Sequence, residues 1–294
     1  MKTLKHQMIQ LLEEILLENK VHQPQVSGVT LFQIKNSFNR CPFAYNSEII
    51  ILARGSKNVY LGSEIISYDS SNYLVLPIPL PAECSGETIE GKAILGMSIT
   101  IEPLDISEML LAMELFPQEP KHVPRGIYSS PLNEPLLESC VRLLKAIQNT
   151  QDERILAPLI KKEILYRILQ DEKGHVLQSL AENNRKFYII SKVLQRIHKS
   201  YNQNFDMQSL AKDNGMSSSK FHSLFKSVTN MSPLQYIKNI RLHKAREFMI
   251  QEGLNATLAS HKVGYESTSQ FNREYKRLFG STPGKDTLSQ REDR

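Results

Sequence analysis

The last third of the sequence contains an internal repeat, and this repeat is the feature that most restricts the possible fold. Each copy has a Leu-Ala pair, two aromatic residues four positions apart, and a Ser-Pro or Thr-Pro pair whose proline follows the first aromatic residue by twelve positions. These positions are Leu210-Ala211, Phe221, Phe225 and Ser232-Pro233 in the first copy, and Leu258-Ala259, Phe271, Tyr275 and Thr282-Pro283 in the second. Repetition of this kind predicts two similar supersecondary units in tandem.

Helix-capping residues predict the same three parts in each copy: a short helix, a tight turn and a second helix. Polar N-cap residues start the helices, and a glycine ends each short helix. The first copy has Asp206, Gly215 and Ser217 at these positions, and the second has Asn255, Gly264 and Ser267. Residues 267–270 also match a capping box. The three parts together are the pattern of a helix-turn-helix unit.

A long helix is predicted between the two units. Ser232-Pro233 supplies its cap and its first-turn proline, and Gly253 ends it. Because one continuous helix would hold both units rigidly, their second helices could enter the major groove of DNA on one face, about 34 Å or one turn apart.

Charge is distributed unevenly along the chain. Residues 185–294 contain 19 Lys+Arg and 9 Asp+Glu, a net charge of +10, whereas residues 1–184 contain 17 and 22, a net charge of −5. A basic segment joined to an acidic one is typical of a polyanion-binding domain with a second domain attached. Charge by itself would also fit a solvated basic surface, so the prediction of DNA binding depends on its combination with the repeat.

The candidate contacts to DNA lie on the polar faces of the two second helices, opposite aromatic residues that the spacing assigns to the core. They are Ser217, Ser219, Lys220, His222 and Ser223 in the first helix, and Ser267, Thr268, Ser269, Asn272, Arg273 and Lys276 in the second. Arginine can bond guanine, and asparagine adenine, through two hydrogen bonds, so Arg273 and Asn272 are the best candidates for reading bases. The caps Ser217 and Ser267 would place helix N-termini near phosphates. Any single amphipathic helix has a solvated polar face. The matched pair of helix-turn-helix units in a basic segment is what favours DNA binding over that alternative.

Residues 190–290 resemble the C-terminal domain of the AraC/XylS family of bacterial transcription regulators. The resemblance rests on Gly215-Met216-Ser217, Ser232-Pro233-Leu234-Gln235-Tyr236, Arg241-Leu242-His243-Lys244-Ala245-Arg246, Val263-Gly264-Tyr265-Glu266-Ser267 and Phe279-Gly280-Ser281-Thr282-Pro283. One departure is His261-Lys262, where many members have smaller or more apolar residues. The resemblance implies a bipartite domain that binds double-stranded DNA, and activation through RNA polymerase or repression by occlusion.

The first half of the chain has a different pattern. Between residues 28 and 101, short β-rich runs alternate with turn residues, at 29–34, 48–53, 59–61, 65–68, 73–78 and 93–101. This spacing predicts a small barrel or jelly roll similar to a cupin. Residues 55–62, 73–75 and 156–174 resemble the AraC-type regulator N-terminal domain and its helical connector. The predicted fold is therefore α+β, with a cupin-like barrel at 1–130, a connector at 131–184 and tandem helix-turn-helix units at 185–294.

A cupin-like barrel raises an alternative function: an enzyme, or a ligand-scavenging barrel, fused to a DNA-binding domain. Metal-dependent cupins hold their metal on histidines, but the sequence has none between His22 and His122. The three cysteines lack ligand spacing, and no Ser/His/Asp or glycine-rich phosphate pattern is present. The sequence therefore predicts no enzyme, no metal and no cofactor.

A barrel without catalytic residues could hold a small-molecule effector in its mouth. The hypothesis places four residues around that pocket, and they are Arg54, Tyr60, Tyr68 and Tyr73. The alternative for each tyrosine is an ordinary half-buried strand residue. Cys41 and Cys84 could sense electrophiles, although a free cysteine is more often an inert small apolar residue.

Helices predicted at 134–149 and 153–172 carry apolar stripes, which could form a dimer seam or pack on the barrel; the family resemblance favours a homodimer. No run approaches the roughly 18 uncharged apolar residues of a membrane span. The chain begins with a charged amphipathic helix, unlike a secretory signal, and its three cysteines are odd in number and far apart. We therefore expect a cytoplasmic protein without a membrane segment.

Overall fold

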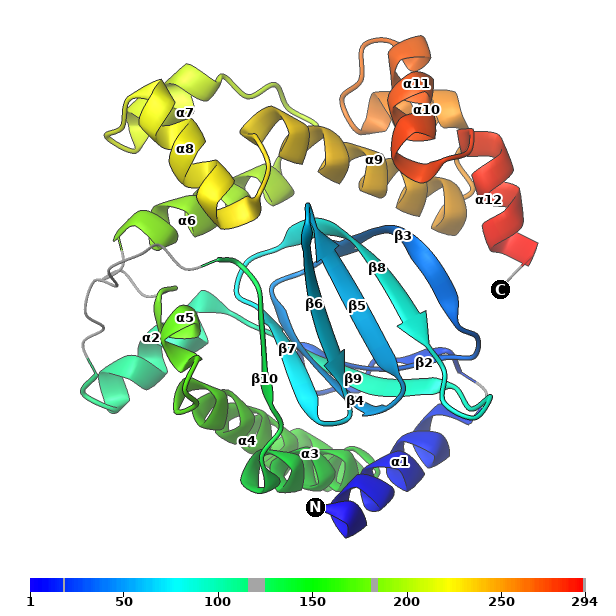
Figure 1. Cartoon of the computed structure of the whole chain (residues 1–294), viewed down its shortest axis with the longest axis vertical. Coiled ribbons are helices and arrows are strands. Elements are labelled where there is room, and N and C mark those ends of the chain that lie inside the picture. Colours follow the sequence, from blue (N-terminus) through cyan, green and yellow to red (C-terminus); the bar gives the residue numbers. More distant parts are fainter. Residues whose placement is uncertain (18, 116–124, 181–184, 293–294) are drawn as a thin grey trace. The chain divides into compact units, whose positions relative to one another are not determined.

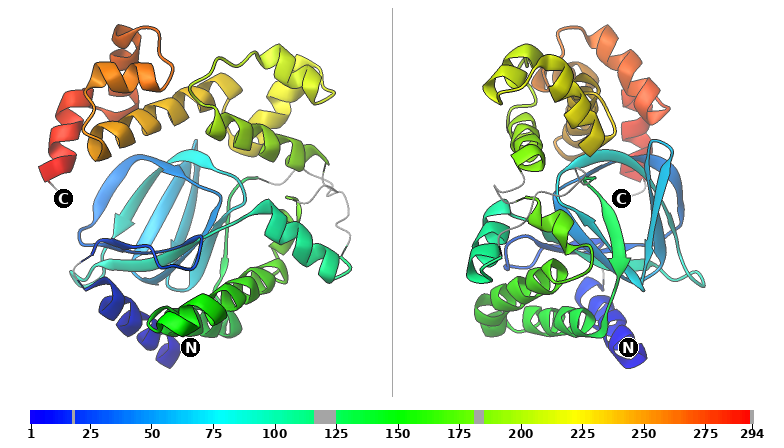
Figure 2. Two further views of the ribbon diagram at one scale, coloured as in Figure 1. Left: turned by 180° about the vertical axis from the view of Figure 1, so that it is seen from behind. Right: turned by 60° about the vertical axis from the view of Figure 1, so that its left-hand side comes forward.

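The computed structural model (Figures 1 and 2) describes residues 1–17, 19–115, 125–180 and 185–292. The chain divides into two compact units, Met1–Arg40 with Tyr45–Tyr188, and Cys41–Ala44 with Ile189–Arg294. Residue 184, where the domain boundary is predicted, lies outside the described residues, as does His122. Within the described ranges, no helix is both long and apolar enough to cross a membrane.

The first unit is built on a curled antiparallel sheet that forms a half-barrel (Figure 1), which confirms the predicted cupin-like fold. Its strands follow the order β1-β2-β9-β4-β7-β6-β5-β8-β3, and β10 pairs with β7. Their bounds are β1 Val21–His22, β2 Val29–Ile34, β3 Phe38–Tyr45, β4 Glu48–Arg54, β5 Ser56–Leu61, β6 Glu64–Asp69, β7 Asn72–Leu76, β8 Leu80–Glu87, β9 Ile94–Thr100 and β10 Tyr128–Pro131.

The sequence pattern did not predict β1, β3, β8 and β10. Three of these strands contain a proline, Pro42 in β3, Pro81 in β8 and Pro131 at the end of β10. Because proline cannot donate a ladder hydrogen bond, the segment containing Pro77, Pro79 and Pro81 looked like a break between strands. β3 lies at the edge of the sheet, where a strand tolerates proline best. β1 and β10 are too short to produce a clear alternation.

The described helices of the first unit are α1 (Lys2–Leu16), α2 (Pro103–Ala112), α3 (Glu134–Ile147), α4 (Thr150–Leu169) and α5 (Gly174–Gln178). α3 packs against both α4 and α1. The predicted apolar stripe of α3 is buried in this packing; its members are Leu136, Leu137, Cys140, Leu143, Leu144 and Ile147. This stripe therefore belongs to the core of the unit and is not free to form a dimer seam.

The second unit is helical from Ile189 onward, and its first helix begins four residues earlier, in the first unit. Its elements are α6 (Arg185–Lys199), α7 (Met207–Asp213), α8 (Ser218–Thr229), α9 (Pro233–Gln251), α10 (Ala256–Lys262), α11 (Thr268–Phe279) and α12 (Pro283–Glu292). The α7–α8 pair and the α10–α11 pair lie toward opposite ends of the long helix α9 (Figure 1). The predicted caps are confirmed, since Asp206, Ser217, Ser232, Asn255 and Ser267 each accept a hydrogen bond from a backbone N–H of the first turn.

Arg241 of α9 joins three backbone segments of this unit. Its guanidinium donates to the carbonyl oxygens of Tyr201 (2.7 Å), Gln203 (2.8 Å) and Gly264 (3.0 Å). Gly264 has φ +84°, and a Cβ there would lie 2.3 Å from the carbonyl oxygen of Asn202, so no side chain fits. The segment after α6 and the turn before α11 are thus held together on α9.

Replacing Arg241 by lysine should lower the free energy of unfolding of the second unit. A lysine ammonium cannot reproduce the planar fork that reaches three carbonyls, so at least one acceptor loses its partner at a cost of about 1–3 kcal/mol. Urea unfolding of the full chain, followed by circular dichroism, measures the change. The control is Arg277→Lys at an exposed position of α11. Equal stability of the two variants would contradict the role of Arg241.

Candidate DNA-binding interface

The N-termini of α8 and α11 are built alike. The Oγ of Ser217 accepts a hydrogen bond from the backbone N–H of Lys220, and the Oγ of Ser267 accepts one from that of Gln270, both at 3.3 Å. One cap satisfies one of the free N–H groups of a first turn and leaves others available at the positive end of the helix dipole. The remaining N–H groups of both termini can therefore donate to a phosphate oxygen.

The polar faces predicted to contact DNA are on the surface of the second unit. The exposed members are Ser217, Ser219, Lys220, Ser223, Ser267, Ser269, Asn272, Arg273 and Lys276. Two members are half-buried. The ring of His222 packs edge-on against Phe221, with centroids 6.1 Å apart, and the Oγ1 of Thr268 lies 3.4 Å from the Oγ of Ser260. His222 and Thr268 therefore offer less side-chain surface than the others.

The opposite faces of α8 and α11 are buried, as the spacing predicts. Four aromatic side chains have no exposed surface: Phe221, Phe225, Phe271 and Tyr275. The ring of Phe225 meets that of Tyr236 on α9 edge to face, with centroids 5.5 Å apart. Since stacking on bases needs an exposed ring, these side chains are core residues that orient the polar faces outward.

The exposed face of α11 carries two side chains able to read bases. Within the described part of the chain, Asn272 and Arg273 form no hydrogen bond or ion pair with the protein. Their donors and acceptors are therefore available to a base edge. The corresponding face of α8 offers the shorter or less directional groups of Ser219, His222 and Ser223.

Glu274 is the sole acidic residue in α11, and the protein compensates its charge. The Nζ of Lys238 on α9 lies 2.7 Å from one carboxylate oxygen, and the hydroxyl of Tyr265 donates to the other at 2.7 Å. Partial burial would raise the pKa of Glu274, but the hydrogen bonds from Lys238 and Tyr265 lower it below its usual value. The paired carboxylate leaves α11 with a basic surface around Arg273.

Gln270 was missed by the sequence analysis although it is exposed on the first turn of α11. The capping-box pattern assigned its side chain to the backbone of Ser267. In the structure its amide Nε2 instead donates to Glu274 at 3.3 Å. A glutamine amide at this position can bond adenine through two hydrogen bonds. The sequence signal that could have identified Gln270 as a candidate DNA contact was its position on the polar side of α11, next to the buried Phe271.

The candidate effector residues of the first unit do not lie together. The Nε of Arg54 donates to the carbonyl oxygen of Ala93 (2.8 Å), and its Nη1 donates to Glu13 of α1 (2.6 Å), so Arg54 fixes α1 to the sheet. Tyr60 is on the half-exposed face of β5, and its hydroxyl lies 3.1 Å from the Oγ of Ser85.

Tyr73 joins the sheet to the end of the connector. Its hydroxyl donates to the carboxylate of Asp171, just beyond α4. The same carboxylate oxygen accepts from the Oγ of Ser130 on β10 at 2.6 Å. These contacts hold the connector against β7 and β10.

Tyr68 lies in the interior of the half-barrel beside Lys57, a lysine that the sequence analysis did not single out. Lys57 is 5% exposed. Its Nζ lies 5.8–6.0 Å from the centroids of four rings, those of Phe32, Phe38, Tyr45 and Tyr68. Burial would lower the pKa of Lys57, but the neighbouring Tyr68, Cys84 and Glu48 raise it above its usual value. The interior therefore contains an ammonium group surrounded by aromatic rings.

The cysteines show no arrangement for metal binding. Cys84 and Cys140 are buried, and Cys41 is half-buried. Burial raises the pKa of the Cys140 thiol to about 12, which keeps it protonated and unreactive. Among the residues that the structure describes, no group of three or more His, Cys, Asp and Glu could hold a metal ion.

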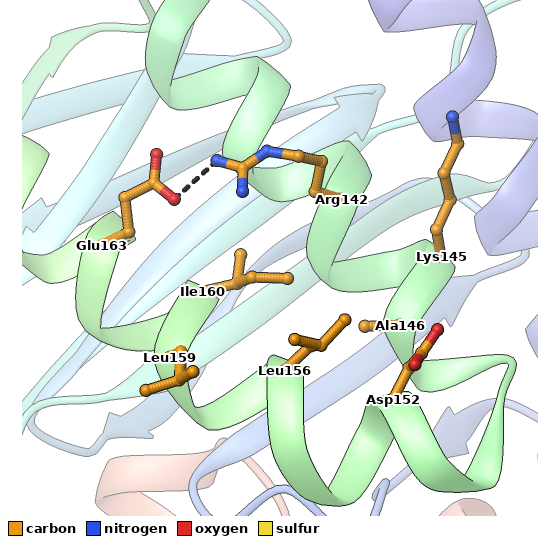
Figure 3. A pocket seen from close by; sticks show the side chains of 8 residues that line it. All are labelled: Arg142, Lys145, Ala146, Asp152, Leu156, Leu159, Ile160 and Glu163. Carbon is orange, nitrogen blue, oxygen red and sulfur yellow. Dashed lines mark hydrogen bonds and ion pairs between the residues drawn. The ribbon is translucent and has the colours of Figure 1, made fainter.

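A groove of about 410 Å³ lies between α3 and α4 (Figure 3). Arg142 and Glu163 form an ion pair at 2.5 Å on one side of it. Leu156, Leu159 and Ile160 of α4 supply apolar surface. None of the predicted site residues lines this groove.

Two family models match the chain. The AraC-type transcriptional regulator N-terminus matches residues 25–176, and a helix-turn-helix domain matches residues 210–287. Among curated proteins, the HTH-type transcriptional regulator ExsA of Pseudomonas aeruginosa is 27% identical over 153 residues, which cover 51% of this chain and 54% of ExsA. The HTH-type transcriptional regulator AlkR of Acinetobacter baylyi is 35% identical over 94 residues, which cover 32% of this chain and 31% of AlkR. The chain thus matches about half or less of the length of these relatives.

Solved structures of ToxT from Vibrio cholerae have the same fold. An apo ToxT variant has a TM-score of 0.59 at 11% identity and covers 90% of this chain and 99% of its own. Wild-type ToxT with a bound unsaturated fatty acid has a TM-score of 0.58 at 12% identity, covering 91% and 97%. At identities of 11% and 12%, this similarity shows that the chain shares its fold with ToxT.

The N-terminal model, which covers half of the chain, describes transcriptional regulators, which confirms the non-enzyme prediction and gives no support to the alternative of a catalytic barrel. The N-terminal model covers 152 of the 294 residues. The chain belongs to the AraC family of transcriptional regulators.

Proposed function

We propose that this chain is a sequence-specific DNA-binding transcription regulator controlled by a small molecule bound in its half-barrel. The observation that carries the proposal is the pair of exposed polar faces on α8 and α11, each backed by buried aromatic residues and both attached to α9. The net charge of +10 in residues 185–294 supports binding to a polyanion. Each reading helix would enter one of two successive major-groove segments.

The two reading helices would contribute unequally. Asn272, Arg273 and Gln270 on α11 can each form two hydrogen bonds with a base, whereas α8 offers serine, histidine and lysine side chains. We infer that the α11 half discriminates bases more strongly. The α8 half would depend more on phosphate contacts and on DNA shape.

The effector would lie in the interior of the half-barrel, at Lys57 and Tyr68. An ammonium group surrounded by apolar rings suits a ligand with one anionic group and an apolar body. ToxT, which has the same fold, is known with an unsaturated fatty acid bound. We therefore propose an organic carboxylate as the effector class. Arg54, Tyr60 and Tyr73 make contacts within the protein and would support the barrel.

The proposal also includes a protein partner, a cellular location and an oligomeric state. A regulator bound beside a promoter would act through RNA polymerase, as an activator or by occlusion. It would work where the chromosome is, in the cytoplasm. The first unit would join two copies into a homodimer.

Arg273→Ala should reduce affinity for a DNA site selected by the full-length protein, by about 1–3 kcal/mol, and should relax preference at one base position. The reason is the loss of a two-bond contact to a base. Fluorescence anisotropy with the selected site and its single-base variants measures both effects. Lys276→Ala is the control and should weaken binding to all variants about equally. Uniform weakening by Arg273→Ala as well would make Arg273 a phosphate contact.

Lys238→Met should weaken binding to the same DNA about fivefold, because it removes the counter-charge of Glu274 beside Arg273. The double variant Lys238→Met/Glu274→Gln removes both charges and should bind nearly as well as the unchanged protein. The anisotropy assay compares the three proteins at one salt concentration. An unchanged affinity for Lys238→Met would show that the pair does not influence the interface.

Lys57→Met should weaken binding of oleate, used below its micellar concentration as a probe carboxylate, about tenfold or more because the ammonium–carboxylate bond is lost. Isothermal titration calorimetry measures the affinity. Tyr60→Phe, on the other face of β5, is the matched control and should bind oleate as the unchanged protein does. If Lys57→Met bound oleate normally, the carboxylate would not lie at Lys57.

A further inference from the structure

Gln270 lies in the first turn of α11, and its side chain is exposed on the polar side of the helix. Its amide Nε2 donates a hydrogen bond of 3.3 Å to the Oε1 of Glu274, four residues further along α11. Within the described part of the chain, the amide oxygen of Gln270 accepts no hydrogen bond. One end of the amide is therefore held by the protein, and the other end is available to a ligand.

The carboxylate of Glu274 is itself fixed from two other parts of the second unit. The Nζ of Lys238 on α9 donates to its Oε1 at 2.7 Å, and the hydroxyl of Tyr265, before α11, donates to its Oε2 at 2.7 Å. The side chain of Glu274 is 12% exposed. Burial and the hydrogen bond to Glu274 raise the pKa of Tyr265, so its hydroxyl keeps its proton and remains a donor. Glu274 is thus an acceptor with a fixed position beside Gln270.

A fixed acceptor determines how the Gln270 amide is turned. Rotation of the amide by half a turn would exchange its nitrogen and its oxygen, and the oxygen would then lie against the carboxylate of Glu274. Two acceptors in contact repel each other, whereas the observed orientation has a hydrogen bond to a charged acceptor. The oxygen of Gln270 is therefore turned away from Glu274, toward the N-terminal end of α11, which is the end of a reading helix that approaches base edges.

The orientation of this amide has a consequence in the major groove, where the bases present different groups. Adenine presents the N6 donor and the N7 acceptor, cytosine presents the N4 donor, and guanine and thymine present the oxygens O6 and O4. The oxygen of Gln270 can accept from adenine or cytosine, and the second N–H of its amide can donate to N7 of adenine. On guanine or thymine, the oxygen would meet another acceptor.

The equivalent positions of α8 lack this arrangement. Alignment of the two copies of the repeat places Lys220 at the position of Gln270 and Leu224 at the position of Glu274. A leucine side chain has no acceptor, so it cannot orient a polar neighbour. Orientation by a fixed carboxylate is therefore a property of α11, the reading helix that also carries Arg273.

We propose that Glu274 is a positioning residue for base recognition. It holds the amide of Gln270 so that α11 prefers adenine, and next cytosine, over guanine and thymine at one base position. The proposal rests on the proposed function, because it needs α11 in the major groove. It adds the identity of one preferred base and assigns the preference to a residue that does not itself touch the base.

Gln270→Ala identifies the base position. Binding sites are selected from a random DNA library by the full-length protein and by this variant, and the position whose preference is lost in the variant is the one that Gln270 reads. The unchanged protein should bind DNA with adenine at this position at least about tenfold more tightly than DNA with guanine or thymine.

Glu274→Gln is the decisive variant. The substituted glutamine can donate as well as accept, so both orientations of the Gln270 amide become possible. In fluorescence anisotropy with each of the four bases at the Gln270 position, the preference for adenine over guanine and thymine should fall to about threefold or less. The preference at the position read by Arg273 should persist, which shows that the variant is folded and that α11 still enters the groove.

Glu247→Gln is the matched control. It removes one negative charge from an exposed ion pair with Lys244 on α9 and should leave the preference at every base position unchanged. Any uniform gain in affinity from the lost charge appears in both variants.

The exchanged pair Gln270→Glu/Glu274→Gln tests the orientation directly. The carboxylate at position 270 can only accept, and the amide at position 274 can donate to it. The preferred base should change from adenine to cytosine, because N4 of cytosine is the matching donor and N7 of adenine would face a second acceptor.

The proposal would be overturned by an adenine preference that is unchanged in Glu274→Gln, or by equal weakening at all positions. A preference of the unchanged protein for guanine or thymine at this position, or no position that depends on Gln270, would also contradict it. If the position disrupted by Arg273→Ala is found while these results fail, the DNA-binding proposal stands alone. Failure to select any binding site would overturn both.

Discussion

The arrangement of the two reading helices depends on aromatic packing against α9. In the first helix-turn-helix unit (α7–α8), Phe225 contacts Tyr236 of α9 edge to face, with ring centroids 5.5 Å apart. In the second helix-turn-helix unit, Phe271, Tyr275 and Phe279 form a row along α11 with centroid distances of 5.5 and 4.5 Å. The ring of Phe279 meets that of His243 on α9 edge to face, with centroids 5.2 Å apart. Because Phe225, Phe271 and Tyr275 are buried, the polar residues on the other side of each helix must face outward. The position of every candidate DNA contact follows from this constraint.

The two helix-turn-helix units differ in a second contact, although the repeat aligns His198 with Arg246 and Tyr236 with Asp286. Beside the first helix-turn-helix unit, the ring of His198 shares a hydrogen bond of 2.8 Å with Tyr236. Burial, with a smaller effect of Lys244, lowers the pKa of His198 to about 4, so the contact is uncharged near neutral pH. Beside the second helix-turn-helix unit, Arg246 and Asp286 form an ion pair at 2.7 Å. This ion pair therefore accompanies the helix-turn-helix unit that carries Arg273.

Local signals explain what the sequence predicted well. Caps, glycine turns and aromatic spacing act within a few residues, so they located α7, α8, α10 and α11 and their exposed faces. Predictions failed where the chain's distant parts decide the outcome. Leu258 matches the buried Leu210 in the repeat but is 55% exposed, because its environment differs. Lys57 looks like a solvated strand residue in the sequence but is 5% exposed, because the sheet curls around it.

If the two reading helices on α9 read DNA unequally, selection of binding sites from a random DNA library by the full-length protein will reveal it. We expect two blocks of preferred bases about one helical turn apart, with the stronger preferences in the block that Arg273→Ala disrupts. A single block, or two blocks of which the one sensitive to Arg273→Ala is the weaker, would contradict this expectation.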